Sequence, residues 1–300
     1  MIKCALLGYG YWGKILLKYL RNNIYLEVKY IYKDKNDKEF LKKMLLDDEL
    51  DCVFICTPIE THYSLCKFFL GSGKHVFCEK PLTGDYYDDI NLYKIANDNN
   101  VILFVDYIYL YSKSINYIKG NIKKLGNIKY IKGEIKQFGK FYKEDVIDVL
   151  GVHIISALNF ILDYDFRNME NFNRFILYKT NERIDDIKMN FILKDIYFEF
   201  DFSQVFDIKK RKIEIFCENA NVVFDMMTEN TVCITFFYDD EEGFKIDKKI
   251  YEIFDESNNL NYSVQAFLEE IFYKKHDNKK YSLLLSKSLN NLKQEIYKST

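Results

Sequence analysis

Proline and long apolar runs are scarce in this chain of 300 residues. The two prolines, Pro58 and Pro81, leave no proline-rich linker that could mark a domain boundary. No apolar run reaches the roughly 18 to 20 residues that span a bilayer, and the N-terminus lacks the features of a signal peptide. A basic excess is also missing, because the formal net charge is −2. We therefore expect neither a membrane protein nor a nucleic-acid-binding protein.

Cysteine is present without a recognisable pattern. The seven cysteines, an odd number, form no Cys-x-x-Cys pair, which argues against structural zinc and thioredoxin-type redox chemistry. Thiols that lie in apolar runs pack as small hydrophobic side chains. The simplest interpretation is a reduced chain in the cytoplasm, with no bound metal.

The first part of the chain alternates short apolar runs with helical patterns. The strand candidates are Ile2–Leu7, Val28–Tyr32, Cys52–Cys56, His75–Cys78 and Val101–Val105. The helix candidates between them are Lys14–Arg21, Glu39–Leu46, His62–Leu70 and Tyr86–Asn97. Buried strands separated by helices of this length predict βαβ units and a parallel Rossmann sheet.

After about residue 120 the strand candidates follow one another directly. They are Lys129–Gln137, Arg174–Lys179, Ile187–Leu193, Tyr197–Phe202, Lys212–Cys217, Val222–Met226 and Val232–Phe237. Several alternate polar with apolar residues, which predicts a sheet with one exposed face, and Lys194-Asp195 predicts a tight hairpin. Helices are expected at Val152–Leu162, Val264–Lys274 and Tyr281–Tyr297. We predict an α/β protein with a Rossmann domain over residues 1–118 and an α/β domain over 119–300, whose open mixed sheet is mostly antiparallel.

A glycine-rich loop connects the first strand to the first helix. Gly8, Gly10 and Gly13 form a Gly-x-Gly-x-x-Gly pattern in the strand–loop–helix context that binds dinucleotides. The first glycine allows the tight turn, the second lets backbone approach a pyrophosphate, and the third lets helix and strand pack closely. With Tyr11 and Trp12, these glycines are the expected cofactor-binding residues of the loop.

The end of the second strand bears on the choice of cofactor. If Asp34 reaches the adenosine ribose, it binds the hydroxyls and the cofactor is NAD(H). If Lys33 occupies that place, a 2′-phosphate of NADP(H) is tolerated. A further alternative is that Lys33 and Lys35 are solvated loop charges, and the sequence does not fix the register within one residue. We lean to NAD(H), because one carboxylate binds both hydroxyls while a lysine can turn outward.

Four segments coincide in order and spacing. They are Gly8–Gly13 (GYGYWG), Cys56–His62 (CTPIETH), Gly73–Pro81 (GKHVFCEKP) and Leu150–His153 (LGVH). Together they resemble the glucose–fructose oxidoreductase / inositol dehydrogenase (Gfo/Idh/MocA) family of NAD(P)-dependent oxidoreductases. The glycine loop and the run Val105–Tyr111 are similar to those of members that act on sugars and nucleotide-linked sugars.

The resemblance implies roles for the matched positions. Thr57, Pro58 and His62 would line the nicotinamide half of the cofactor site. Glu79 and Lys80 would lie at the end of the next strand and would also bind the cofactor. In that position Lys80 would present a cation to the substrate hydroxyl or carbonyl.

The same resemblance makes His153 the general acid/base, a task that suits its unperturbed pKa near neutrality. The family pattern Asp-x-Gly-x-His is broken here, because Val149 stands at the Asp position. Asp148 is adjacent but lies about 100° away on a regular helix, so it could serve only on irregular backbone. Ile154 is apolar where sugar-acting relatives often carry Asp.

The predicted function is NAD(P)-dependent hydride transfer at a secondary alcohol or ketone of a sugar or nucleotide-activated sugar. The resemblance also implies a homodimer or homotetramer. The alternative is a cofactor-binding pseudoenzyme with a regulatory or scaffolding role, which Val149 and Ile154 favour and which Lys80 and His153 oppose. The sequence leaves open which sugar, which carbon and which direction are involved.

Overall fold

The computed structural model describes residues 1–34, 36–138 and 143–298. The chain divides into two compact units, and each unit is built from two separate stretches of sequence. The first unit comprises Met1–Ile108 and Asn258–Ser286. The second comprises Tyr109–Ser257 and Lys287–Thr300.

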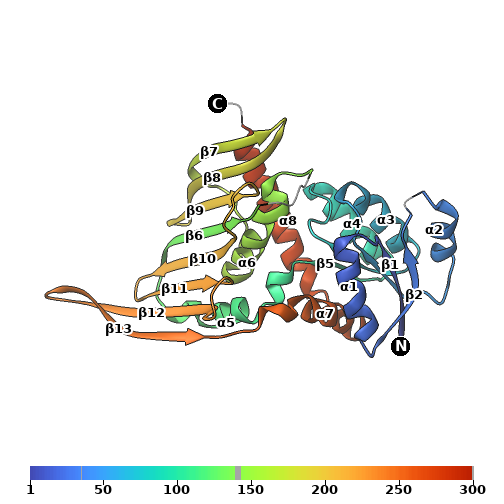
Figure 1. The fold of residues 1–300 in the computed structure, drawn as a ribbon, viewed down its shortest axis with the longest axis horizontal. Helices are drawn as coiled ribbons and strands as arrows, with labels where there is room; N and C mark the ends of the chain where they lie inside the picture. The colour runs from blue at the N-terminus through green and yellow to red at the C-terminus, as the bar shows by residue number, and fades with distance from the viewer. Residues whose placement is uncertain (35, 139–142, 299–300) are drawn as a thin grey trace. The chain divides into compact units, whose positions relative to one another are not determined.

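A five-stranded parallel sheet forms the centre of the first unit (Figure 1). Its strands are β1 (Ile2–Leu7), β2 (Leu26–Tyr32), β3 (Cys52–Ile55), β4 (His75–Glu79) and β5 (Leu103–Asp106). The connecting helices are α1 (Tyr11–Asn22), α2 (Lys38–Leu45), α3 (His62–Gly71) and α4 (Tyr86–Asp98). The spatial order is β2-β1-β3-β4-β5, so the direction of winding reverses between β1 and β3. In open α/β sheets, ligands bind at the carboxyl ends of the strands beside such a reversal.

Helix α7 (Asn259–Tyr273) packs against this sheet although it is distant in sequence. The ring of Phe267 lies 5.5 Å from that of Phe54 and 5.6 Å from those of Phe77 and Phe104, centroid to centroid. The start of α8 (Asp277–Tyr297) is fixed as well, because the side-chain amide of Asn278 bonds the backbone of β5 as both donor and acceptor. These contacts explain why residues 258–286 belong to the first unit.

The second unit contains an eight-stranded sheet in the order β13-β12-β11-β10-β6-β9-β8-β7. Its strands are β6 (Ile128–Lys136), β7 (Glu170–Thr180), β8 (Arg183–Leu193), β9 (Ile196–Ser203), β10 (Lys210–Cys217), β11 (Ala220–Asp225), β12 (Val232–Asp240) and β13 (Gly243–Glu252). Neighbouring strands pair antiparallel except β6 and β9, which are parallel. Helices α5 (Lys113–Asn121) and α6 (Val152–Leu162) also belong to this unit.

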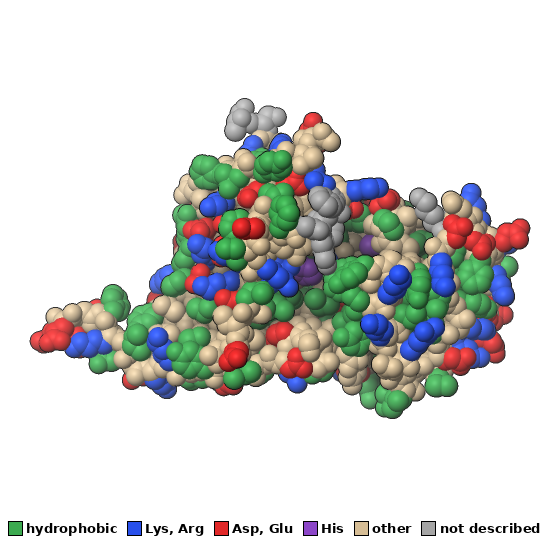
Figure 2. Space-filling model, viewed as in Figure 1, with side chains coloured by type: hydrophobic (Ala, Val, Ile, Leu, Met, Phe, Trp, Pro, Cys, Tyr) green, Lys and Arg blue, Asp and Glu red, His purple; other side chains and the backbone are tan. Residues whose placement is uncertain are grey.

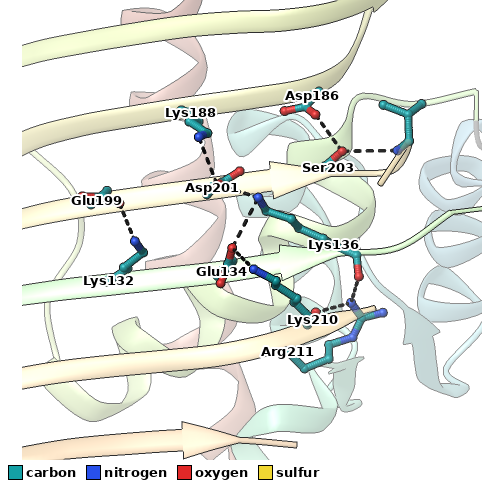
Figure 3. A network of polar contacts seen from close by, with 11 residues as sticks. Lys132, Glu134, Lys136, Asp186, Lys188, Glu199, Asp201, Ser203, Lys210 and Arg211 are labelled. Atoms are coloured by element: carbon teal, nitrogen blue, oxygen red, sulfur yellow. Dashed lines mark hydrogen bonds and ion pairs between the residues drawn. The ribbon is translucent and has the colours of Figure 1, made fainter. Parts of the chain in front are cut away.

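The two faces of this sheet differ in chemistry, as alternation along a strand requires. Apolar residues such as Ile131 and Phe200 are fully buried on the face that α6 covers. A Cβ at Gly133 would lie 2.5 Å from a methyl carbon of Ile154 in α6, so the helix approaches the strand closely there. The opposite face, called the open face below, carries Lys132, Glu134, Lys136, Glu199 and Asp201 (Figure 3).

The predicted fold class is confirmed, and so is the hairpin between β8 and β9. Lys194 and Asp195 have φ values of 52° and 61°, which suits the type I′ turn that joins paired strands. Two elements escaped prediction, α5 and β13. Strand β13 is interrupted by the charged run Asp247-Lys248-Lys249, and its pairing with β12 shifts register between Phe236 and Phe237. The predicted domain boundary after residue 118 stays a prediction, because a compact unit need not be an independently folding domain.

Candidate functional site

The three loop glycines meet different surroundings. Gly8 has a φ of +95°, and a Cβ there would lie 2.5 Å from the carbonyl oxygen of Cys56. A Cβ at Gly13 would lie 1.9 Å from the carbonyl oxygen of Gly8. The turn and the helix–strand packing therefore require both glycines. Gly10 has nothing within 4 Å of its Cβ position, so the chain leaves open space there, as a bound pyrophosphate needs.

The first turn of α1 begins at this open space. Gly10 is the N-cap residue, so no side chain caps the backbone N–H groups of the first turn, and that turn carries no acidic residue. An uncapped helix N-terminus with its positive dipole end suits an anion. Tyr11 and Trp12 are 66% and 46% exposed beside it. These features fit the pyrophosphate of a dinucleotide cofactor.

The loop after β3 is closed by short hydrogen bonds. The hydroxyl of Thr61 lies 2.7 Å from the hydroxyl of Thr57 and 2.7 Å from the carbonyl oxygen of Pro58. The backbone N–H of Cys56 donates to the carbonyl of Leu7 at 2.8 Å, which ties the loop to the end of β1. Thr57 and Pro58 therefore follow the strand next to the glycine loop, and their expected place at the nicotinamide stays a prediction.

His62 connects this loop to the turn after β4. Its Nε2 lies 2.8 Å from the carbonyl oxygen of Thr57, while its Nδ1 lies 2.9 Å from that of Leu82 and 3.1 Å from that of Pro81. The side chain is only 2% exposed, and burial lowers the pKa of His62 although the carbonyl groups favour its protonated form. The geometry gives His62 the task of holding two loops together. Its expected contact with the cofactor stays a prediction.

The carboxyl end of β4 presents Glu79 and then Lys80, whose peptide bond to Pro81 is cis. Glu79 pairs in register with Asp106 of β5. Burial raises the pKa of Glu79, although the positive charge of Lys80 acts to lower it. Burial and the nearby carboxyl group of Glu79 raise the pKa of Asp106. Two buried carboxyl groups therefore lie in register at the end of β4 and β5, and the charge of Lys80 acts against the rise of both pKa values.

Asp106 was missed as a candidate residue. It is buried, and it accepts a 2.5 Å hydrogen bond from the hydroxyl of Ser263 in α7, 157 positions away in sequence. Only the sheet register and this distant contact reveal its environment. The sequence signal was its place directly at the end of a buried strand.

In the second unit, His153 lies in the first turn of α6 and is partly buried. Its ring centroid is 5.3 Å from that of Tyr109, with 33° between the ring planes. Burial raises the pKa of Tyr109 to about 12, so its phenol stays neutral. Tyr109 in turn contacts Phe224 edge to face. A fixed aromatic neighbour of this kind restricts the orientation of the His153 ring.

The backbone before His153 is irregular, since Ile147–Gly151 forms a π-helix in which the N–H of Val152 bonds the carbonyl of Ile147. Such single-turn π-helices are frequent at functional sites. The carboxylate of Asp148 lies 2.7 Å from the ammonium of Lys293, a cation of α8. Val149, at the family Asp position, is buried.

Packing accounts for two other residues of this segment. A Cβ at Gly151 would lie 2.8 Å from the ring of Phe202, so the backbone passes close to the sheet there. Ile154 is fully buried against Gly133. The apolar residue at 154 therefore belongs to the layer between α6 and the sheet.

The expected site residues thus fall into both units. The loop glycines, Thr57, His62, Glu79 and Lys80 lie at the carboxyl edge of the parallel sheet, and Asp34 lies in the loop after β2. His153 belongs to the second unit. Within residues 1–34, 36–138 and 143–298, no cluster of three or more His, Cys, Asp or Glu side chains could hold a metal ion. Nor does that part of the chain contain a helix long and apolar enough to cross a membrane.

Comparison with known proteins begins with the first unit. Residues 2–107 match the family model described as an oxidoreductase family with an NAD-binding Rossmann fold, which bears the name of the family that the motifs resemble. An uncharacterised oxidoreductase of Streptococcus pneumoniae is 28% identical over 130 residues, which cover 40% of this chain and 35% of that protein. The chain thus matches about a third of the length of this curated relative.

Solved structures are similar over nearly the whole chain. A UDP-N-acetylglucosamine 3-dehydrogenase of Acidithiobacillus ferrooxidans superposes with a TM-score of 0.82 and 16% identity, covering 99% of this chain and 98% of its own. A 3-ketoreductase of Actinomadura kijaniata, crystallised with NADP, gives 0.79 and 16%, covering 97% and 96%. At this identity the likeness establishes the shared fold of both units.

Proposed function

We propose that this chain, whose residues 2–107 belong to the Gfo/Idh/MocA oxidoreductase family, is an NAD(P)-dependent oxidoreductase that acts on a secondary alcohol or ketone of a sugar. The observation that carries the proposal is the open space at Gly10. The fold itself demands Gly8 and Gly13, whereas Gly10 stands at the N-cap of α1 with open space at its Cβ position, and this space leaves room for a pyrophosphate.

The chemistry divides between cofactor and protein. A bound nicotinamide supplies or accepts the hydride, and the side chains bind, orient and move the proton. Lys80 would stabilise negative charge that develops on the substrate oxygen. The buried carboxyl groups of Glu79 and Asp106 are close enough for the charge of Lys80 to act on their pKa values. His153 would give or take the hydroxyl proton.

The proposed substrate is a sugar or a nucleotide-activated sugar. Two solved relatives of the same fold are described as a UDP-N-acetylglucosamine 3-dehydrogenase and a 3-ketoreductase, the latter also with a TDP ligand. The glycine loop with Tyr11 and Trp12 has the form found in sugar-acting members. These likenesses support the substrate class and leave the particular sugar and carbon open.

A second candidate function is a cofactor-binding pseudoenzyme. The observation that favours it is the apolar packing near His153, where Val149 and Ile154 are buried in place of carboxylates. Asp148 is engaged with Lys293. The pseudoenzyme would bind the dinucleotide through the same glycine loop and catalyse no hydride transfer.

We also propose a homodimer or homotetramer that forms through the open face. Its central charges are matched within the chain: Lys132 with Glu199 at 2.9 Å, Lys136 with Asp201 at 2.6 Å and Lys210 with Glu134 at 3.0 Å (Figure 3). Internal pairing lowers the cost of covering these charges with another surface. Light scattering should give a multiple of 36.0 kDa, and a mass of 36.0 kDa itself would contradict this part of the proposal.

The test of function is a panel of nucleotide sugars and free polyols, and of their keto forms, assayed with both cofactors by nicotinamide absorbance. The oxidoreductase proposal expects turnover of at least one sugar. Tight cofactor binding without turnover on the whole panel would instead support the pseudoenzyme.

A further inference from the structure

We infer that the cofactor site selects NADP(H), through a cluster of Tyr9, Lys14 and Lys33 that binds the 2′-phosphate of the adenosine ribose. The inference rests on the proposed function, because it assumes that the glycine loop binds a nicotinamide dinucleotide. These three residues are called the Tyr9 cluster below.

The Tyr9 cluster lies at the junction of the glycine loop, α1 and the end of β2. The ammonium nitrogen of Lys33 is 4.7 Å from the centroid of the Tyr9 ring, and that of Lys14 is 5.5 Å from it. The backbone N–H of Gly8 donates to the carbonyl of Tyr32 at 2.9 Å, which holds the end of β2 beside the loop. In Rossmann folds the residue after β2 reaches the adenosine ribose.

The charges of the cluster are unbalanced. Neither Lys14 nor Lys33 forms an ion pair with a carboxylate in the described part of the chain, and the first turn of α1 is without acidic residues. Two ammonium groups that approach one exposed ring repel each other, and the ring faces offset this only modestly. A phosphate dianion between them converts the repulsion into two attractions.

Asp34, the residue that would favour NAD(H), has a different orientation. Its Oδ1 accepts a 2.9 Å hydrogen bond from the backbone N–H of Asn36, within the loop that follows β2. Lys33, one residue earlier, is the side chain that contacts the glycine loop. Of the alternatives left open by the sequence, the structure therefore favours the one in which Lys33 stands at the ribose.

The experiment is a titration of the purified chain with NADPH and with NADH, followed by the fluorescence of Trp12. That residue is the only tryptophan of the sequence and lies in the first turn of α1. We expect NADPH to bind at least about tenfold more tightly, a difference of about 1.4 kcal/mol. Lys33→Glu should reverse the preference by placing an acidic group at the ribose.

Two further variants distinguish a loss of 2′-phosphate binding from a general loss of folding or of dinucleotide binding. Lys14→Gln should weaken NADPH binding and leave NADH binding nearly unchanged, because the assignment has Lys14 bind the cofactor through the 2′-phosphate, which NADH lacks. Lys18→Gln is the matched control, an exposed lysine of the same helix outside the cluster, and should alter neither affinity. Melting curves of all variants show whether each one folds.

The possible results distinguish the inference from the proposed function. Equal affinities, or a preference for NADH, overturn the assignment of the Tyr9 cluster and do not contradict the proposed function. A Lys33→Glu protein that folds and keeps the wild-type preference for NADPH also overturns it. Binding of neither dinucleotide to the folded wild type rejects the proposed function itself.

Discussion

At the scale of single residues, the glycine loop contains one glycine whose replacement should affect cofactor binding and others whose replacement should affect folding. Gly10 has extended backbone, with φ −76° and ψ −161°, and open space around its Cβ position. We predict that Gly10→Val changes the free energy of unfolding by less than about 0.5 kcal/mol. It should nevertheless weaken dinucleotide binding at least about tenfold, because the valine occupies the space for the pyrophosphate.

Gly8→Ala is the contrasting variant. A Cβ at φ +95° and 2.5 Å from a carbonyl oxygen should lower the free energy of unfolding by about 2 to 4 kcal/mol. Urea unfolding and fluorescence titration of both variants check the pair of predictions. Undiminished dinucleotide affinity in a folded Gly10→Val protein would show that the pyrophosphate lies elsewhere.

Motif residues were predictable from sequence because their spacing along the chain reflects one local structure. The glycine pattern and the strand-end position of Lys80 are of this kind. Asp106 was not predictable, since its burial depends on Ser263 and on the register with Glu79. The contact of Lys33 with Tyr9 likewise depends on how β1 and β2 pair, which the sequence leaves uncertain by one residue.

At the scale of elements, α7 is expected to stabilise the parallel sheet it covers. Phe267 is fully buried among three phenylalanine rings of β3, β4 and β5. Phe267→Ala should lower the free energy of unfolding by about 3 to 5 kcal/mol, through lost burial and the cavity it leaves. Phe272→Ala in the same helix removes a ring that is 53% exposed and should cost less than about 1 kcal/mol. Similar losses in urea unfolding of the two variants would contradict this account of α7.

The start of α8 predicts a dependence of stability on pH. Glu270 is buried and accepts a 2.7 Å hydrogen bond from the backbone N–H of Asn278. Burial, with a smaller effect of Asp277, raises the pKa of Glu270 from 4.5 to about 7. The folded state therefore holds this proton more tightly than the unfolded state. The corresponding stability is fully present below about pH 4.5 and is lost as the pH rises towards about 7.

Glu270→Gln isolates this effect, because glutamine can still accept the hydrogen bond from Asn278 and does not titrate. Relative to the variant, the wild type should lose up to about 3 kcal/mol of unfolding free energy between these pH values. Urea unfolding at several pH values measures the difference. Parallel pH profiles for the two proteins would show that the carboxyl group is not perturbed in this way.

Element types were easier to predict than their extent and regularity. Apolar and polar residues alternate along β8 and β9, and apolar residues recur with the helical period in α6. The spacing of apolar residues in the sequence is enough to predict these elements. Strand β13 was missed because it owes its place to pairing with β12 rather than to an apolar pattern of its own. The π-helix before α6 arises where the backbone of Gly151 passes the ring of Phe202, a contact that no local pattern encodes.

At the scale of the whole molecule, the sequence indicates two units of different architecture but does not show which residues belong to each unit. Residues 258–286 pack with the first unit although they follow all the strands of the second. Helical periodicity predicted these helices without their partners, because an apolar helix face fits either sheet. On the face drawn in Figure 2, Lys and Arg side chains are interspersed with Asp and Glu.

The central proposal is that this chain catalyses hydride transfer, with Lys80 and His153 as its catalytic residues. The most direct measurement is turnover of the best sugar by the wild type, Lys80→Ala and His153→Ala, with cofactor affinity recorded for each. Lys94→Ala is the control, an exposed lysine of α4. We predict that each site variant loses about 10²- to 10⁴-fold in turnover and keeps its cofactor affinity, while the control matches the wild type. Wild-type turnover in both site variants would contradict the account.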